Sequence, residues 1–374
     1  MSTTARKTGP LKVVVAGGGT AGHIEPAMAV ADAISNAGGE VLALGTARGL
    51  ETTIVPDRGY ELSLIDPVPI PRKPNVDLVK VPHRLQKAVR QAKKALKDFD
   101  ADVLIGFGGY VSAPAYLAAK RLGIPFFVHE ANARAGMANK LGVRLGGIGL
   151  NAVRDSGLPG QVVGIPIRAS LLGTDSAVAK ARAQSQWELN PGKPVILVTG
   201  GSQGARSINT AIAEGIDEVL AAGFQVLHSY GKKNEAPPAQ PGYVPVPYIE
   251  DMGAAYAIAD LIVCRSGAMT VAENSAAGIP AIYVPLPHGN GEQALNAQEV
   301  VDAGGARLIA DADFRGQVFV DVVTKILGTP DTLAAMQAAT RASQAGNAAE
   351  VIAELLDEAG FNARNENHAD SGER

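Results

Sequence analysis

Short runs of β-branched and aliphatic residues alternate with longer amphipathic segments along the chain. In the first half these runs lie at 11–16, 41–45, 103–106 and 125–128, and each is bounded by Gly or Pro. Runs of this length and composition are typical of strands that are buried on both faces. Because segments of helix length separate them, the pattern predicts an α/β protein whose parallel sheet is covered by helices.

The pattern begins again at Pro194, so we predict two doubly wound domains. The strands of the second domain are expected at 195–199, 225–229, 261–264 and 281–284. Between the halves, the segment 169–191 is rich in Ala, Ser and Gln and is predicted to be helical. We place the domain boundary near Arg168, which gives an N-terminal domain at 1–168 and a C-terminal domain at 169–342.

A further amphipathic helix is predicted near the end of the chain, at about 343–362. Asn347 and Glu350 have the spacing of a capping box, and Gly360 is expected to end the helix. Its apolar face consists of Val351, Ile352, Leu355 and Leu356. We expect this helix to pack back on the N-terminal domain, and the polar segment 363–374 to be disordered.

Composition and charge exclude several classes of protein. Hydrophobic residues make up 46% of the chain and charged residues 19%, which is far from the signature of disorder. The net charge of −3 provides no global attraction to nucleic acid. Cys264 is the single cysteine, which excludes an intrachain disulfide and a cysteine-rich zinc site. No apolar run is long enough to span a membrane and the first ten residues are polar, so the expected location is the cytoplasm.

Two glycine-rich segments, 17–23 and 200–206, each join a predicted strand to a predicted helix. Peptide N–H groups at the start of a helix attract anions, and the helix dipole adds to this attraction. The effect is only about 0.3–2 kcal/mol at each helix, so one loop alone does not establish a phosphate site. A plain strand-to-helix turn is the alternative for each loop.

The spacing Gly17-x-Gly19-x-x-Gly22 also matches the fingerprint of dinucleotide-binding dehydrogenases. That fingerprint requires an acidic residue after the second strand to bind the ribose, but here Gly45 and Thr46 follow the strand. A nicotinamide site would also leave the second glycine loop unexplained. We therefore reject the dehydrogenase interpretation.

Around both loops the sequence resembles the MurG family, the bacterial glycosyltransferases that add N-acetylglucosamine to the undecaprenyl-linked muramyl-peptide precursor of the cell wall. Seven segments carry the resemblance in the right order: GGGTAGHIEPAMA at 17–29, GFGGYVSAPA at 106–115, HEANARAGMANK at 129–140, VGIPIR at 163–168, GGSQGARSIN at 200–209, YIEDMGAAYAIADLIVCRSGAMTVAE at 248–273 and HGNGEQALNA at 288–297.

The resemblance implies a GT-B fold, in which two Rossmann-like domains face each other across a cleft. It also implies an inverting transfer from UDP-N-acetylglucosamine (UDP-GlcNAc) to the C4 hydroxyl of the lipid-linked muramyl-pentapeptide, in peptidoglycan biosynthesis. Two positions depart from the family pattern. Ala21 stands where glycine is usual and requires a negative φ, and Glu292 stands where glutamine is frequent, which favours Gln293 as the sugar contact.

Such a transfer needs a base to deprotonate the acceptor hydroxyl. His23 is the first candidate, because its unperturbed pKa of about 6.5 suits proton transfer near neutrality. Alternatively, His23 caps the helix or binds phosphate or acceptor by a hydrogen bond. Glu130 could act as the base instead or orient the acceptor, and Tyr110 could line the acceptor pocket.

The leaving diphosphate needs a positive or dipolar environment. Thr20, Ala21 and Gly22 in the first loop and Ser202 in the second are candidates, and Arg168 is a natural counter-ion because its guanidinium binds two oxygens at once. The resemblance assigns the nucleotide pocket to Ala268, Met269, Thr270, Val271, Ala272 and Glu273, with Glu273 accepting from the ribose hydroxyls and Ile249 near the uracil. Asn132, Gln293 and Asn296 have amide side chains suited to the sugar hydroxyls and the acetamido group.

We expect no metal held by the protein, although a divalent cation could accompany the diphosphate. Asp98 with Asp100, and Asp311 with Asp313, are spaced like the acidic pairs of metal-using transferases, but neither pair lies in a matching segment. Solvated turns explain both pairs.

A lipid-linked acceptor requires contact with an anionic membrane surface, and the segment 72–97 carries nine Lys or Arg and one Asp. Its basic face consists of Lys87, Arg90, Lys94 and Lys97, and its apolar face of Leu85, Val89, Ala92 and Leu96. We expect peripheral attachment to the inner face of the plasma membrane. The alternative is an ordinary basic helix whose apolar face covers the sheet.

Two other functions remain open from the sequence. Another GT-B enzyme that uses UDP-GlcNAc, such as a 2-epimerase or a glycolipid synthase, would share the donor pocket but not the acceptor residues. A binding module for nucleotide sugars would need no base.

Overall fold

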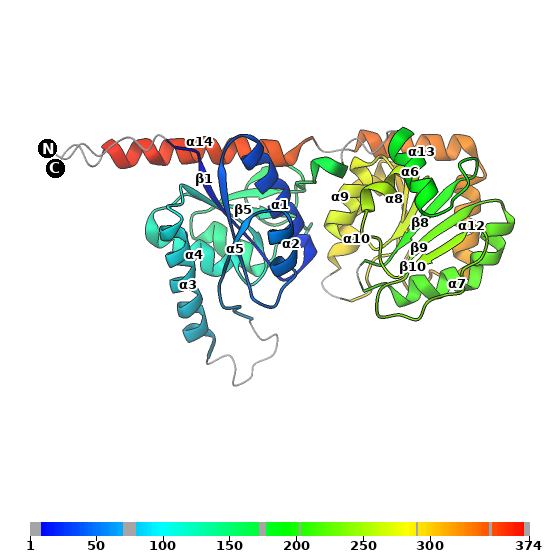
Figure 1. Ribbon diagram of the computed structural model, residues 1–374, viewed down its shortest axis with the longest axis horizontal. Coiled ribbons are helices and arrows are strands. Elements are labelled where there is room, and N and C mark those ends of the chain that lie inside the picture. Colours follow the sequence, from blue (N-terminus) through cyan, green and yellow to red (C-terminus); the bar gives the residue numbers. More distant parts are fainter. Residues whose placement is uncertain are drawn as a thin grey trace. The chain divides into compact units, whose positions relative to one another are not determined.

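The computed structural model describes residues 9–69, 80–171, 177–201, 203–288, 291–343 and 346–369. Within this part the chain forms two compact units (Figure 1). The first contains the chain up to Arg168 together with the segment that starts at Gly346, and the second begins at Ala169. This division coincides with the boundary that the sequence predicts.

The first unit contains a parallel sheet in the order β3-β2-β1-β4-β5-β6-β7. Its strands are β1 (Lys12–Gly17), β2 (Glu40–Gly45), β3 (Glu61–Leu64), β4 (Val103–Gly108), β5 (Phe126–Glu130), β6 (Ile148–Asn151) and β7 (Gln161–Val162). The chain builds the sheet outward from β1 in one direction and then from β4 in the other. The loops after β1 and β4 therefore lie at the switch point, where ligands of doubly wound sheets bind.

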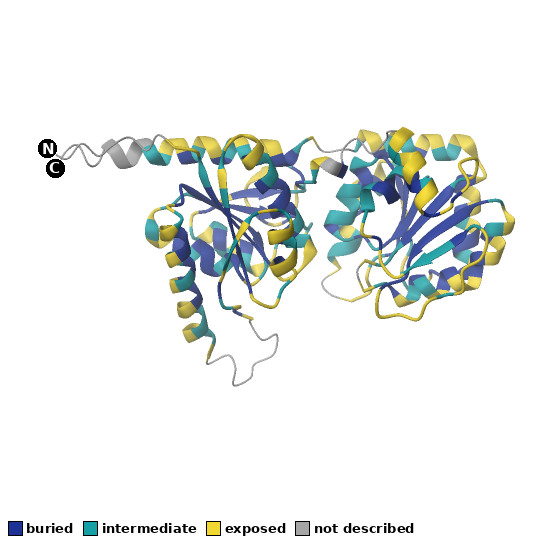
Figure 2. Cartoon of the chain, in the orientation of Figure 1, coloured by how far each residue is buried: buried dark blue, intermediate teal, exposed yellow. Residues whose placement is uncertain are grey.

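Helices cover both faces of this sheet. They are α1 (Ala21–Asn36), α2 (Glu51–Asp57), α3 (Val81–Asp98), α4 (Ser112–Leu122), α5 (Met137–Arg144) and α14 (Ala348–Ala369). Val13 and Val15 pack with α1 and α14 on one face, whereas Val14 and Leu104 pack with α3 and α4 on the other. The central strands β1, β4 and β5 are accordingly buried almost throughout, whereas β3 and β7 near the edges are not (Figure 2).

The second unit repeats the plan with the strand order β10-β9-β8-β11-β12-β13. Its strands are β8 (Val195–Thr199), β9 (Gln225–Ser229), β10 (Tyr243–Val246), β11 (Leu261–Cys264), β12 (Ala281–Tyr283) and β13 (Ala306–Leu308). Its helices are η2 (Ala169–Leu171), α6 (Ala177–Gln186), α7 (Arg206–Ala221), α8 (Met252–Ile258), α9 (Ala268–Ala276), α10 (Glu292–Asn296), α11 (Gln298–Asp302), α12 (Gly316–Leu327) and α13 (Pro330–Ala342). Here the switch point lies between β8 and β11.

The last helix packs on the first unit, as expected, through Ile352 and Leu356. The prediction that it ends at Gly360 is wrong, and so is the disorder predicted for 363–369, because α14 continues to Ala369. Gly360 lies against Leu11, so a Cβ there would only displace the end of the Leu11 side chain. Arg364 holds the next turn by pairing with Asp102 and donating to two backbone carbonyls. The remainder of the predicted tail, 370–374, lies outside the described residues.

The basic helix of the sequence is α3. Val89, Ala92 and Leu96 are buried against the sheet and Leu85 is partly buried there, so the apolar face belongs to the core. The basic side chains at 87, 90, 94 and 97 are exposed. None of the described helices is both long and apolar enough to cross a bilayer.

Candidate active site

Two glycine loops meet at the switch point of the first unit. After β1, the chain passes through Gly19, which has a φ of +87°, and enters α1 at Ala21. At the end of β4, Gly108 has a φ of +99°, and Gly109, which follows it, has a φ of +80°. A Cβ on Gly109 would lie 2.3 Å from the Gly18 carbonyl oxygen, so only glycine allows the two loops to approach this closely.

The half-buried His23 lies between these loops. Its Nδ1 is 3.2 Å from the Gly18 carbonyl oxygen and 3.3 Å from the Thr20 hydroxyl. A carbonyl oxygen can only accept, so the hydrogen bond to Gly18 places the proton of the neutral ring on Nδ1. The lone pair is then on Nε2, which lies over Gly108. The ring is thus held in the tautomer that can accept a proton at Nε2.

Glu130 ends β5 with its carboxylate buried. Oε1 accepts from the backbone and side-chain N–H groups of Asn132, and Oε2 accepts from the Gly136 amide and the Asn139 side chain at 2.9 Å each. Asn139 also accepts from the buried Tyr116 hydroxyl at 3.0 Å. Four donors occupy this carboxylate, so its geometry suits a residue that orders the loop 131–136 better than one that accepts a proton from substrate.

The first unit also contains the predicted site residues Thr20, Ala21, Tyr110 and Arg168. Thr20 precedes α1 in extended conformation, and Ala21 has no positive φ, which satisfies the condition that its methyl group imposes. Tyr110 is 51% exposed beside Gly19. Arg168 is half-buried, with Nε 3.4 Å from the Glu25 carboxylate on α1. Arg58 shares this carboxylate with Arg168.

In the second unit, the loop after β8 has left-handed glycines at 201 and 204. A Cβ on Gly204 would lie 2.1 Å from the Tyr230 carbonyl oxygen. Asn234 donates to the carbonyls of Gln203 and Tyr230, which fixes the loop against the segment after β9. Ser202, the predicted diphosphate contact, lies outside the described residues.

The loop after β11 leads into α9, where the resemblance places the nucleotide pocket. Glu273 is half-buried, and its Oε2 accepts from the Tyr256 hydroxyl of α8 at 3.0 Å. Burial and the Glu273 charge raise the pKa of Tyr256 well above its usual value, so its hydroxyl stays a donor. Ile249, just before α8, is buried. Glu273 is therefore a held carboxylate and not a freely solvated helix charge.

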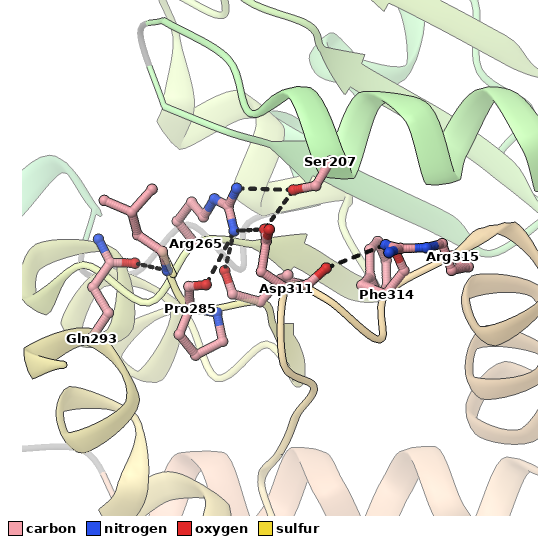
Figure 3. A network of polar contacts seen from close by, with 9 residues as sticks. Ser207, Arg265, Pro285, Gln293, Asp311, Phe314 and Arg315 are labelled. Atoms are coloured by element: carbon pink, nitrogen blue, oxygen red, sulfur yellow. Dashed lines mark hydrogen bonds and ion pairs between the residues drawn. The ribbon is translucent and has the colours of Figure 1, made fainter. Parts of the chain in front are cut away.

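Two side chains of α10 bind backbone groups of the segments that follow β11 and β12. Gln293 Oε1 accepts from the Leu286 amide at 2.9 Å, and Asn296 donates to the Ser266 carbonyl at 3.4 Å. Arg265, just after β11, connects several segments of this unit (Figure 3). It pairs with Asp311 and donates to the carbonyls of Val284 and Pro285 and to the Ser207 hydroxyl. The structure thus places Asn296 against Ser266, just before α9, and Gln293 against the loop that follows β12.

Sequence reasoning missed several of these supporting residues. Glu51, Asn139 and Arg265 all lie near predicted site residues. Glu51 binds Gly19 and Arg265 binds Asp311, and both of these partners are distant in sequence. Asn139 lies inside the matching segment 129–140, which was the only signal available for it. In each of the two acidic pairs noted in the sequence, one aspartate forms an ion pair with a basic side chain. Asp98 pairs with Lys94, and Asp311 pairs with Arg265. Among the described residues, no three His, Cys, Asp or Glu side chains are grouped as metal ligands.

Comparison with family models matches both units. The glycosyltransferase family 28 N-terminal domain matches residues 13–145, and the family 28 C-terminal domain matches residues 195–355.

Similar proteins and structures agree with these matches. The UDP-N-acetylglucosamine--N-acetylmuramyl-(pentapeptide) pyrophosphoryl-undecaprenol N-acetylglucosamine transferase of Corynebacterium efficiens is 66% identical over 93% of this chain and 97% of its own length. The protein of that name from Mycolicibacterium smegmatis is 52% identical over 92% and 93%. The crystal structure of Acinetobacter baumannii MurG matches with a TM-score of 0.75 and 29% identity, over 93% of this chain and all of that one.

Proposed function

Because this chain belongs to the family of UDP-N-acetylglucosamine--N-acetylmuramyl-(pentapeptide) pyrophosphoryl-undecaprenol N-acetylglucosamine transferases, with the GT-B fold, we propose that it catalyses the reaction in that name. The enzyme transfers N-acetylglucosamine from UDP-GlcNAc to the C4 hydroxyl of the lipid-linked muramyl-pentapeptide, a step of peptidoglycan biosynthesis. The observation that carries this proposal is the 66% identity over 93% of the chain.

In the proposed mechanism His23 is the general base. Nε2 takes the proton of the acceptor hydroxyl while that oxygen attacks the anomeric carbon on the face opposite UDP. The bond between the anomeric carbon and the diphosphate oxygen breaks, and UDP leaves with the bonding electrons, so the configuration inverts. The tautomer that the Gly18 carbonyl selects supports this role, because it leaves Nε2 unprotonated.

The remaining residues receive supporting roles in this proposal. Glu273 accepts hydrogen bonds from the ribose, and Gln293 and Asn296 contact the sugar. Arg168 and loop amides take up the diphosphate charge, so that no metal held by the protein is needed. Glu130 orders its loop, since four donors already occupy its carboxylate.

We also propose that the enzyme works at the inner face of the plasma membrane, because its acceptor is lipid-linked. The exposed basic side chains of α3 support an electrostatic contact with anionic lipid, at about 1 kcal/mol for each group. The buried apolar face of α3 does not take part. In this proposal the enzyme attaches by electrostatic contact, which salt weakens, and no helix inserts into the bilayer.

Incubation with labelled UDP-GlcNAc and lipid-linked muramyl-pentapeptide tests the proposed reaction. Label in the lipid fraction supports the transfer. Free epimerised sugar would indicate a 2-epimerase, and binding of UDP-GlcNAc with neither product would indicate a binding module.

A further inference from the structure

Glu51, at the start of α2, is a fully buried carboxylate with no assigned role. Three glycines make room for it: a Cβ on Gly18, Gly45 or Gly49 would lie within 2.8 Å of a Glu51 atom. Oε1 accepts from the Thr46 amide and hydroxyl at 2.8 Å each, and Oε2 accepts from the Gly19 amide at 3.2 Å.

Burial by itself would raise the pKa of Glu51. The hydrogen bonds from its own amide, Thr46 and Gly19 outweigh this effect and hold the pKa below its usual value. Glu51 is therefore a negative charge placed directly behind the first glycine loop.

The Gly19 amide and the Gly18 carbonyl belong to one peptide group. Glu51 accepts the N–H of this group, and His23 Nδ1 donates to its C=O at 3.2 Å. A carboxylate that accepts from a peptide N–H polarises the peptide, which makes its oxygen a better acceptor. The three groups form a continuous chain from carboxylate through peptide to imidazole.

We propose that Glu51 is a positioning residue for His23, acting through the Gly18–Gly19 peptide group to fix the Nδ1–H tautomer and to stabilise the imidazolium that forms when Nε2 takes a proton. The catalytic part of this inference rests on the proposed function of His23. The coupling itself does not, because it concerns the protein without substrate.

The sign of the effect follows from charge. A negative Glu51 favours the protonated ring, so removing the charge lowers the pKa of His23. The other titratable side chains on neighbouring described elements include Tyr110 after β4, His129 and Glu130 on β5, and Glu25 and Asp32 on α1. Glu25 is paired with Arg58, and Glu130 is occupied by four donors, so neither replaces Glu51 in contact with this peptide group.

NMR of the full chain labelled with ¹⁵N-histidine tests the coupling directly. The His23 signals are assigned by their loss in His23→Gln. In the wild type we expect the neutral ring to carry its proton on Nδ1. In Glu51→Gln we expect the pKa of His23 to fall by about half a unit or more, since the charge is lost. Glu51→Asp keeps the charge and is expected to shift the pKa less.

Thr46→Val is the matched control, because it removes one hydrogen bond of Glu51 but leaves the contact with Gly19. It should lower stability without moving the pKa of His23. A wild-type ring protonated on Nε2 would overturn the inference, even if no Glu51 variant folds. An unchanged pKa of His23 in folded Glu51→Gln would overturn it as well.

The transfer rate separates the two proposals. If His23 is the base, Glu51→Gln should lower kcat by about two- to threefold for a half-unit fall in the pKa, because a less basic imidazole accepts the proton less readily, and should move the acid limb of the pH profile to lower pH. A pKa shift without any change in that profile would support the coupling and overturn the catalytic role of Glu51.

Discussion

At the scale of single residues, Glu273 offers the sharpest test of the donor pocket. Tyr256 donates to one of its oxygens, and the proposed role is to accept from the ribose hydroxyls. Glu273→Ala should weaken UDP binding by about 10–100-fold, the range for a hydrogen bond to a charged group.

Calorimetry with UDP and with 2′,3′-dideoxy-UDP checks this prediction. The dideoxy nucleotide should bind wild type and variant equally, because it has no hydroxyl for Glu273 to accept from. Glu250→Ala, which removes the same charge from an exposed position, should leave UDP binding unchanged. Equal weakening of both nucleotides by Glu273→Ala would place Glu273 away from the ribose.

The sequence identifies residues that lie inside contiguous motifs, and it misses those whose role depends on distant partners. His23, Tyr110 and Glu130 are predicted as site residues because their motifs match a family. Glu51 is missed because its partner Gly19 lies 32 residues away, and nothing near Glu51 in sequence indicates the contact. The sequence also does not predict that the Glu130 carboxylate is occupied by donors, because this depends on how the loop 131–136 folds around it.

At the scale of elements, α5 positions Asn139, whose side chain donates to the Glu130 carboxylate. Gly142 of this helix faces Tyr116, and a Cβ there would lie 2.7 Å from the ring. Although alanine favours helices, Gly142→Ala should lower the free energy of unfolding by about 1–3 kcal/mol, because the buried ring must move.

Urea unfolding measures the effect of Gly142→Ala. Gly136→Ala is the control, since the nearest atom to a Cβ there is 3.9 Å away and its φ is −70°. Equal or greater stability of Gly142→Ala would contradict the close packing described for α5.

A second prediction at this scale concerns β9 and pH. Burial lowers the pKa of His228 to about 4, and its two nitrogens contact Tyr243 and Asn209. Since the unfolded chain binds this proton below about pH 6.5, the free energy of unfolding should fall between about pH 6.5 and 4, by up to about 3 kcal/mol.

Urea unfolding of wild type and His228→Gln across this pH range checks the contribution. The variant lacks the group, so its stability should fall less steeply as the pH decreases. Parallel pH dependences would exclude His228 as the source.

The elements themselves are largely predictable where burial is complete. The runs at 195–199, 225–229 and 261–264 become β8, β9 and β11 with those bounds. The sequence misses the strands β3, β6, β7, β10 and β13. Each is two to four residues long and includes exposed or partly exposed positions, so it lacks a long continuous apolar run. The length of α14 is misjudged because Arg364 binds Asp102, a contact that no local pattern reveals.

At the scale of the whole molecule, attachment to lipid should depend on the outer face of α3. We expect the combined variant Lys87→Glu, Arg90→Glu, Lys94→Glu and Lys97→Glu to bind anionic vesicles far less than wild type, because each basic group contributes about 1 kcal/mol. Sedimentation with vesicles at low and high salt measures the partition, and affinity for UDP-GlcNAc should not change.

The control for this variant reverses four exposed lysines of the second unit, Lys180, Lys193, Lys233 and Lys325, and has the same net charge. It should retain vesicle binding. If both variants lose vesicle binding equally, net charge rather than α3 explains the loss. If neither variant loses vesicle binding, α3 does not contact the membrane.

The rate of N-acetylglucosamine transfer by His23→Ala, measured together with its affinity for UDP-GlcNAc, tests the central claim most directly. If His23 accepts the proton of the acceptor hydroxyl, kcat should fall by about 10²–10⁴-fold while UDP-GlcNAc binds as it does to wild type. A loss of less than about tenfold, or a loss explained by weaker binding of UDP-GlcNAc, would contradict the assignment of His23 as the base.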